Sequence, residues 1–263
     1  MKENVDVKIL VSQLEKTFRN RRGETIQALA GLNLEVREGE FLCLLGPSGC
    51  GKSTLLHIMA GFEPATRGEV FIDGKPVTGP NPRYLTLFQN YGLFPWRNVL
   101  GNVEYGLEVQ GAPREKRRRV AGEYISLVGL DKFIYNFPQE LSGGMQQRVA
   151  LARALAVDPE IVFMDEPLGA LDAITRICMQ EEISRIWREH KKTIVFVTHD
   201  IEEAVFLADR IVIMTPHPGR IKSIVPVPMG RARHRTQPDF VKVRDQVYIE
   251  LQIETEETLD YNI

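Results

Sequence analysis

The sequence contains few cysteines, and their spacing is not that of a metal site. The chain has 263 residues and three cysteines, Cys43, Cys50 and Cys178, an odd number without paired ligand spacing. Cys43 lies in an apolar run and Cys50 in a glycine-rich segment. We therefore expect reduced thiols in a reducing cytoplasm, and neither a disulfide-stabilised secreted fold nor a zinc domain.

Long hydrophobic runs are also missing. No apolar run reaches the roughly 18 residues of a membrane span, and residues 1–7 lack the apolar core of a signal peptide. We expect a chain that does not span a membrane. No internal repeat is visible, so we expect no domain to occur twice. The chain is long enough for one large or two small domains.

An excess of charge of one sign is absent as well. With 33 basic and 35 acidic residues, the formal net charge is −2, whereas a dedicated nucleic-acid binder is usually strongly basic. The densest basic run, Arg114–Arg119, has no interleaved aromatic residues and is typical of a solvated helix face. We therefore expect no nucleic-acid partner.

The most informative stretch present is a glycine-rich loop of the form G-x-x-x-x-G-K-[ST], whose backbone N–H groups close around phosphates. Its flanks agree with this interpretation, because Phe41–Leu45 predicts a buried strand and Lys52–Ala60 a helix that ends at Gly61. The sequence therefore predicts a nucleoside triphosphate site at the start of a helix. The loop consists of Gly46, Pro47, Ser48, Gly49, Cys50, Gly51, Lys52, Ser53 and Thr54.

Each part of this loop has an expected role. The three glycines would supply unusual backbone angles, Lys52 would place a positive charge on the β- and γ-phosphates, and Ser53 would offer a hydroxyl to Mg²⁺.

Two further buried strands are predicted to end in polar residues. Ile161–Met164 precedes Asp165 and Glu166, and Ile194–Val197 precedes the segment that contains His199. In a chain with a phosphate loop, Asp165 is suited to hold Mg²⁺ and Glu166 to polarise the attacking water. His199 could sense the γ-phosphate through a hydrogen bond.

A second helix start has the character of an anion site. Ser142, Gly143 and Gly144 open a helix predicted to run to about Ala156. Two glycines in a first turn are destabilising unless something approaches the backbone closely, and a helix N-terminus attracts anions. One triphosphate hardly needs two such sites, whereas a head-to-tail dimer would use both.

Two aromatic features leave alternatives open. Phe18, at the end of a predicted strand, could stack on a purine or be an ordinary core residue.

Gln89 follows the strand candidate Leu85–Phe88, at the end where ligands gather in α/β sheets. The next segment, Tyr91–Trp96, either packs into a small second core, which the residues alone slightly favour, or forms an exposed patch for a partner.

Together these motifs resemble the ATP-hydrolysing subunit of ABC transporters over about residues 5–225. The resemblance implies an α/β fold in which a P-loop NTPase core of mainly parallel sheet carries an antiparallel β subdomain and an inserted α-helical subdomain. The ABC-type ATPase domain would span 1–225, with the helical subdomain at about 90–157, and a C-terminal extension would follow at 226–263.

The resemblance also implies ATP and Mg²⁺ as ligands, and a role for each motif. The catalytic residues would be Lys52, Glu166 and His199, and the metal would be held by Ser53, Asp165 and Gln89, the last also joining the site to the membrane partner. Phe18 would stack on adenine. The opposite subunit would contribute Ser142, Gly143 and Gly144 to the γ-phosphate, with Asp172 in a dimer-contacting loop. Met145 stands where glutamine is commoner in the family.

Partners and location follow from the same resemblance. It implies a second ATPase subunit (the same chain or a close paralogue) and an integral membrane permease that docks near Tyr91–Trp96. A periplasmic or lipid-anchored solute-binding protein would act indirectly. The chain would be peripheral, at the cytoplasmic face of the inner (cell) membrane. The resemblance thereby favours a docking surface over a second core for the aromatic segment.

A narrower likeness is to the ATPases of nitrate, sulfonate, taurine and bicarbonate importers. It rests on four segments, Gln89–Trp96, Leu168–Ala173, Asp200–Ala204 and Pro218–Ile221. It predicts that ATP-driven dimer closure powers import of a small anion. The rivals are a non-transport ATPase of the same fold, a nucleotide-gated module without turnover, which Glu166 and His199 disfavour, and a small-molecule kinase, which leaves Leu141–Gly144 unexplained.

The last part of the chain predicts an amphipathic helix that packs on its own domain. Phe240, Val243, Val247 and Leu251 would share one face. An acidic tail follows, which we expect to be disordered.

Overall fold

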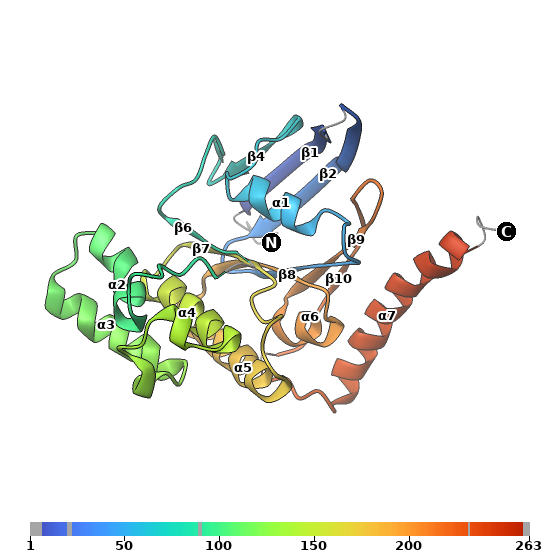
Figure 1. The fold of residues 1–263 in the computed structure, drawn as a ribbon. Helices are drawn as coiled ribbons and strands as arrows, with labels where there is room; N and C mark the ends of the chain where they lie inside the picture. Colours follow the sequence, from blue (N-terminus) through green and yellow to red (C-terminus); the bar gives the residue numbers. More distant parts are fainter. Residues whose placement is uncertain (1–6, 20–22, 89–90, 231, 260–263) are drawn as a thin grey trace, which may run out of the picture. The chain divides into compact units, whose positions relative to one another are not determined.

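The computed structural model describes residues 7–19, 23–88, 91–230 and 232–259. The chain divides into two compact units, the first comprising Met1–Pro82 and Trp187–Ile263 and the second Arg83–Ile186. Figure 1 follows the chain through its strands and helices. Within the described ranges, none of the helices combines the length and the apolar character needed to cross a membrane.

An antiparallel sheet forms one part of the first unit. Its strands are β1 (Val7–Arg19), β2 (Thr25–Arg37), β4 (Arg67–Ile72) and β5 (Lys75–Pro76), in the order β2-β1-β4-β5. Buried and exposed residues alternate along much of β1 and β2, as in strands with one solvated face. The buried side chains include Ile9, Val11, Leu14, Leu32, Leu34 and Val36.

Parallel strands form the core of the first unit. β3 (Phe41–Leu45) lies between β8 (Thr193–Thr198) and β9 (Arg210–Thr215) and is parallel to both, and β10 (Arg220–Pro226) is antiparallel to β9. Every residue of β3 and β8 is buried, because α1 (Lys52–Met59) and α6 (Ile201–Leu207) cover these strands. Burial on both faces explains their uninterrupted apolar sequence.

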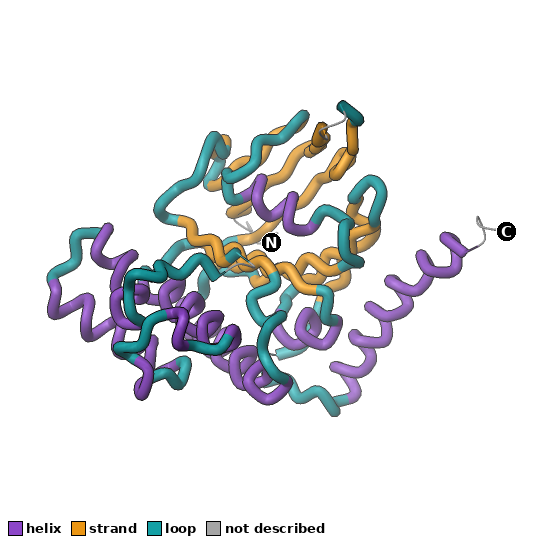
Figure 2. Tube along the Cα trace, in the orientation of Figure 1, coloured by secondary structure: helices purple, strands orange, loops and turns teal. Residues whose placement is uncertain are grey.

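The second unit is mainly helical (Figure 2). β6 (Tyr84–Leu87) and β7 (Ile161–Asp165) pair in parallel, while α2 (Val99–Val109), α3 (Arg114–Leu127) and α4 (Gly143–Ala156) pack on one another. Two 3-10 helices, Asp131–Phe133 and Pro138–Glu140, join α3 to α4. α5 (Ala173–His190) starts in this unit and ends in the first. The helices of the predicted insertion at 90–157 thus belong to this unit, whereas the predicted domain boundaries stay a prediction.

The C-terminal helix packs on the first unit, as its amphipathic pattern predicts. In α7 (Pro238–Leu259), Phe240, Val243 and Val247 are buried and Leu251 is half-buried. The helix contacts α6 and β9 (Figure 1, red). The prediction of a disordered acidic tail is wrong for the described residues, in which α7 continues to Leu259. Glutamate is a good helix former, which makes this continuation favourable.

One buried arginine of the C-terminal extension completes the end of α6. Arg233 is 5% exposed, and its Nη1 donates to the carbonyls of Val205, Phe206 and Ala208 at 2.8, 3.0 and 2.8 Å. The last carbonyls of a helix have no partner within the helix. A cation at this end also interacts favourably with the helix dipole.

We expect Arg233→Met to lower the free energy of unfolding by about 2–4 kcal/mol, because it leaves these buried carbonyls without a donor. Urea denaturation followed by circular dichroism measures the change. The matched control is Arg220→Met, at an exposed position of β10, for which a loss below about 0.5 kcal/mol is expected. Equal losses in the two variants would contradict this role for Arg233.

Candidate nucleotide-binding and hydrolysis site

The phosphate loop has the backbone that its glycines predict. Gly46, Gly49 and Gly51 have φ values of 158°, 81° and 91°, a region that favours glycine. Space is restricted too: a Cβ on Gly46 would lie 2.5 Å from the Met214 carbonyl oxygen, and one on Gly51 2.5 Å from Leu29 Cδ2. The loop between β3 and α1 therefore requires glycine at both positions.

Lys52 is held within this loop. Its side chain is buried, with 5% exposed, and Nζ donates to the carbonyls of Gly46 and Pro47 at 2.8 and 2.9 Å. α1 starts at Lys52, and the first N–H groups of a helix lack partners within it. Glycine cradle, ammonium group and helix N-terminus together fit a polyphosphate.

Cys50 is a buried member of the loop with a neutral thiol. It is fully buried, and its Sγ lies 3.7 Å from Lys52 Nζ. Burial raises the pKa of the Cys50 thiol above its usual value, although the nearby Lys52 charge acts in the opposite direction. The thiol therefore adds no negative charge to a site for anions.

The two acids lie at the end of β7 in the second unit. Asp165 is buried, and Glu166 is half-buried with a φ of 47°. A left-handed backbone is uncommon outside glycine, asparagine and aspartate and is costly for other residues, and such residues concentrate at functional sites. The turn after Glu166 is closed by a hydrogen bond from Gly169 N to the Glu166 carbonyl at 3.3 Å. This backbone fixes where the Glu166 side chain starts.

The start of α4 is closely packed at one of its two glycines. Ser142 is the N-cap, and its Oγ accepts from Met145 N at 3.3 Å. A Cβ on Gly144 would lie 3.3 Å from Leu171 Cδ2, and one on Gly143 3.4 Å from the Tyr91 hydroxyl. The contact at Gly144 is tighter than side chains ordinarily make, whereas that at Gly143 is an ordinary van der Waals distance. Packing against Leu171 therefore accounts for Gly144, and the helix start stays accessible at Ser142 and Gly143, which are exposed.

Asp172 starts α5. Its exposed carboxylate accepts from Thr175 N at 3.0 Å, as N-cap aspartates do. Hydrogen bonds from the Thr175 side chain and backbone lower the pKa of Asp172 below its usual value. The carboxylate is therefore ionised at neutral pH.

His199 is exposed, and the backbone on both sides of it is anchored. Thr198 is buried and donates to Glu203 Oε2 at 2.7 Å, while Asp200 N donates to Thr198 Oγ1 at 3.0 Å. Asp200 in turn caps α6 by accepting from Glu203 N at 3.1 Å. The imidazole is thus presented from a fixed loop at the end of β8.

Phe18 lies near the end of β1 and is 38% exposed. Lys16 Nζ is 4.8 Å from the centroid of its ring. The exposed position does not fit the alternative of an ordinary core residue, and a ring that reaches solvent is what purine stacking needs. Gln89 lies outside the described residues.

The predicted site residues divide between the two units. The first unit contains Phe18, the phosphate loop and His199, and the second contains Ser142, Gly143, Gly144, Asp165, Glu166 and Asp172. Each unit therefore carries one helix start suited to an anion.

Two residues that support the aromatic segment were not predicted from the sequence. Asn102 is fully buried, its Oδ1 accepts from Phe94 N at 2.8 Å, and its Nδ2 donates to the Arg97 carbonyl at 2.8 Å. Arg153 donates to the carbonyls of Gly92 and Tyr91 at 2.8 and 3.0 Å, and burial lowers its pKa. The sequence signal that could have identified Asn102 and Arg153 is a polar residue among apolar neighbours in a helix.

A glycine loop between a buried strand and a helix, with acids at the end of a parallel strand, defines a phosphate-loop nucleoside triphosphatase. The ABC transporter family matches residues 29–169, and the chain belongs to this family. It is an ABC-type ATPase and an ATP-binding subunit.

Relatives agree with this assignment. An uncharacterized ABC transporter ATP-binding protein of Methanocaldococcus jannaschii is 50% identical over 94% of this chain and 92% of its own length. The nitrate import ATP-binding protein NrtD of Synechococcus elongatus is 44% identical over 91% of this chain and 86% of its own. The bicarbonate transport ATP-binding protein CmpC of the same organism is 44% identical over 91% of this chain and 37% of its own length. The narrower likeness to importer ATPases is thereby confirmed.

Solved structures agree as well. A dimeric ATP-binding cassette in a post-hydrolysis state with ADP and Pi has a TM-score of 0.77 and 34% sequence identity, and the match covers 84% of this chain and all of the other. A second dimeric structure, of a bacterial ABC transporter cassette, gives the same TM-score with 36% identity and the same coverage. The predicted α/β fold with a P-loop NTPase core is confirmed.

Proposed function

We propose that this chain powers import of a small anion through a membrane permease, by ATP-driven closure of a dimer. The observation that carries the proposal is the 44% identity, over 91% of the chain, to proteins named for nitrate import and bicarbonate transport. Nitrate and bicarbonate are therefore the first candidates, with taurine and alkanesulfonates next. A solute-binding protein would deliver the anion to the permease, and the permease would hold this chain at the cytoplasmic face of the membrane.

The residues present fit ATP with Mg²⁺. Lys52 and the N–H groups at the start of α1 would bind the phosphates, and Ser53, Asp165 and Gln89 would hold the metal through oxygen atoms, which Mg²⁺ prefers. In the described part of the chain, no group of three or more His, Cys, Asp or Glu side chains could bind a metal by itself. This fits a metal bound together with nucleotide. When bound, Mg²⁺ would neutralise charge on the phosphate oxygens.

Hydrolysis would depend on two side chains held by their backbones. Glu166 would accept a proton from the attacking water, from a backbone position fixed at a φ of 47°. His199 would hydrogen-bond to the γ-phosphate from its anchored loop. Ser142 and the N–H groups of Gly143 and Gly144 would contact the γ-phosphate held by the opposite subunit. Positioning and charge stabilisation would supply most of the rate enhancement.

A head-to-tail dimer explains why one chain carries two anion-binding helix starts. In the closed dimer each phosphate loop would face the Ser142 helix start of its partner. ATP then acts as a ligand that favours the closed state, so the energy available for transport is its differential affinity for closed over open. The dimeric cassettes among the structural relatives support this arrangement.

The aromatic segment supports a docking site for the permease. A cavity of about 470 Å³ is lined by Tyr91, Leu93, Pro95 and residues of the segment before α4. Trp96 and Tyr135 are 72% and 71% exposed, which is unusual for large aromatic side chains outside interfaces. Asn102 and Arg153 hold the backbone of this segment. A rigid surface with exposed aromatics suits insertion of a short helix of the permease.

We expect Trp96→Glu to abolish recovery of the permease while the isolated subunit still hydrolyses ATP, because a charge at the centre of an apolar interface prevents docking. Affinity purification from detergent-solubilised membranes measures the recovery. Tyr248→Glu, at an exposed position of α7, is the matched control and should recover the permease fully. Normal recovery with Trp96→Glu would contradict docking at this surface.

Transport in a defined system tests the proposed function. The chain, its co-purified permease and its solute-binding protein would be reconstituted in proteoliposomes, with ATP on the side of this chain. We expect ATP-dependent uptake of nitrate or bicarbonate, and none with Glu166→Gln. ATP hydrolysis without uptake of any of the four anion classes would overturn the assignment as an importer of small anions.

A further inference from the structure

A cavity of about 900 Å³ opens in the first unit at the edge of the sheet opposite the phosphate loop. Its walls come from the residues before β3, from those before β9, and from the end of α5. β3 and β9 are parallel, so both meet the cavity with their amino ends, whereas the phosphate loop follows the carboxyl end of β3. The cavity is therefore separate from the nucleotide site.

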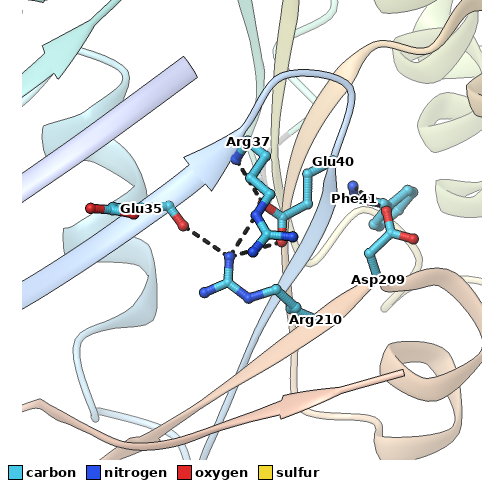
Figure 3. Close-up of polar contacts among 6 residues, drawn as sticks. All are labelled: Glu35, Arg37, Glu40, Phe41, Asp209 and Arg210. Atoms are coloured by element: carbon cyan, nitrogen blue, oxygen red, sulfur yellow. Dashed lines mark hydrogen bonds and ion pairs between the residues drawn. The ribbon is translucent and has the colours of Figure 1, made fainter. Parts of the chain in front are cut away.

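The acidic groups that line the inner part of this cavity are already paired (Figure 3). Glu40 is 5% exposed and forms an ion pair with Arg210 Nη1 at 3.0 Å. It also accepts from Arg37 N at 2.7 Å. Asp209 Oδ2 accepts from Phe41 N at 2.9 Å. Glu40 therefore has a cation of the chain as its partner, and Asp209 has a backbone donor.

The basic groups, by contrast, keep donors to spare. In Arg210, the hydrogen bonds to Glu40 and to the Glu35 carbonyl, at 3.0 Å each, all come from Nη1, so Nε and Nη2 are used by none of the described residues. Arg37 and Lys191 also line the cavity, and within the described ranges neither forms an ion pair. Only one further carboxylate, that of Glu38, lines the described cavity. Arg37 and Lys191, which have no carboxylate partner among the described residues, and the remaining donors of Arg210 thus face one carboxylate without a partner, that of Glu38.

The remaining wall is apolar and stiff. Trp187 is held by a hydrogen bond from Nε1 to the Gly39 carbonyl at 3.1 Å, and Lys191 Nζ lies 4.8 Å from its ring centroid. Ile224 is 38% exposed, and Pro226 and Pro228 flank Val227 on the same wall. The cavity thus places an exposed apolar side chain, Ile224, beside cationic groups. A ligand that fits both needs an apolar part and a negative charge.

We infer that this cavity binds a small organic anion, with one carboxylate or phosphate directed at Arg37, Arg210 and Lys191 and a short apolar body against Ile224 and Val227. Its volume is within the range of small-molecule sites, which typically combine an apolar lining with a few placed polar groups. Guanidinium groups bind carboxylate and phosphate through paired hydrogen bonds. The inference does not depend on the proposed transport function.

The test uses small-molecule probes that share a short alkyl chain and differ in the charge of the head group. The chain has two tryptophans, Trp96 and Trp187, so Trp96→Phe leaves Trp187 as the reporter in the wall. Its fluorescence would be titrated with sodium hexanoate, hexyl phosphate, hexylammonium chloride and hexanol. We expect saturable binding of hexanoate or hexyl phosphate, at least about tenfold tighter than of the cation and the alcohol. The stronger of the two anions identifies the class of head group.

Charge reversal at the rim provides the second arm. Arg37→Glu combined with Lys191→Glu should weaken binding of the anion at least about tenfold. The matched control is Arg114→Glu with Lys116→Glu, the same change of charge on exposed positions of α3, and Lys52→Ala should bind the anion normally. The inference would be overturned by the Trp96→Phe chain, in which Arg37 and Lys191 are unchanged, if it showed no saturable binding or bound hexanol, hexylammonium and hexanoate with equal affinity.

Discussion

Glu166→Gln is expected to stop turnover while ATP stays bound, and to accumulate a dimer. The amide cannot accept a proton from water, and loss of a general base costs roughly 10²–10⁴-fold in rate. The half-buried position and the backbone at φ 47° are unchanged by an isosteric substitution. Nucleotide binding should therefore persist, and the closed state that hydrolysis would reopen should persist with it.

Phosphate release and size-exclusion chromatography with ATP measure these two effects. Glu160→Gln is the matched control, because Glu160 precedes β7 in the same unit and forms an ion pair with Arg83 at 3.3 Å on the surface. It should hydrolyse ATP normally and stay in the same monomer–dimer equilibrium as the unmodified chain. Brisk turnover in Glu166→Gln would remove Glu166 as the base.

Lys52→Ala is expected to lose most of its affinity for ATP. Truncating one partner of a buried charge pair costs about 2–5 kcal/mol, or a factor of roughly 30 to several thousand in affinity. The ammonium group is already within the loop, 2.8 Å from the Gly46 carbonyl, so binding needs only a small rearrangement of this side chain. Loss of catalysis follows from loss of binding.

Equilibrium dialysis with labelled ATP measures the affinity directly. Lys75→Ala, at an exposed position of β5, removes the same group elsewhere and should bind ATP like the unmodified chain. Thermal unfolding of both variants separates lost affinity from lost structure. Unchanged ATP binding in a folded Lys52→Ala variant would contradict the role of the phosphate loop.

The parts of the fold that the sequence predicts are those with uniform patterns. β3, β7 and β8 are uninterrupted apolar runs because both faces are covered, and α1 is bounded by the phosphate loop and by Gly61, with a φ of 81°. α4 also ends at its predicted bound, Ala156. In these segments local sequence and tertiary burial point to the same structure.

α2 was not predicted, and the reason is physical. Its sequence contains Gly101 and Gly106, which ordinarily weaken a helix. In the structure, a Cβ on Gly106 would lie 2.2 Å from Val157 Cγ1, so this glycine permits close packing. The gain from packing against α4 exceeds the cost in propensity, and that gain depends on a residue 51 positions away.

Motif spacing named candidate residues for the site, but it could not supply their supports. The left-handed backbone at Glu166 and the contacts of Asn102 and Arg153 arise from tertiary packing. The cavity lined by Arg37, Lys191 and Arg210 is likewise built from three segments far apart in the sequence. Apart from the polar positions of Asn102 and Arg153 in otherwise apolar helix segments, these features have no local pattern to detect.

The most direct test of the central claim is the ATPase rate of the complex that this chain forms in native membranes. The tagged chain would be purified from mildly solubilised membranes with its partners, and the rate measured with nitrate, bicarbonate, taurine and alkanesulfonates in turn, each with the solute-binding protein present. The account predicts recovery of a multi-span permease and stimulation of ATP hydrolysis by one of these anions. Recovery of soluble partners alone would contradict it and would favour a non-transport ATPase of the same fold.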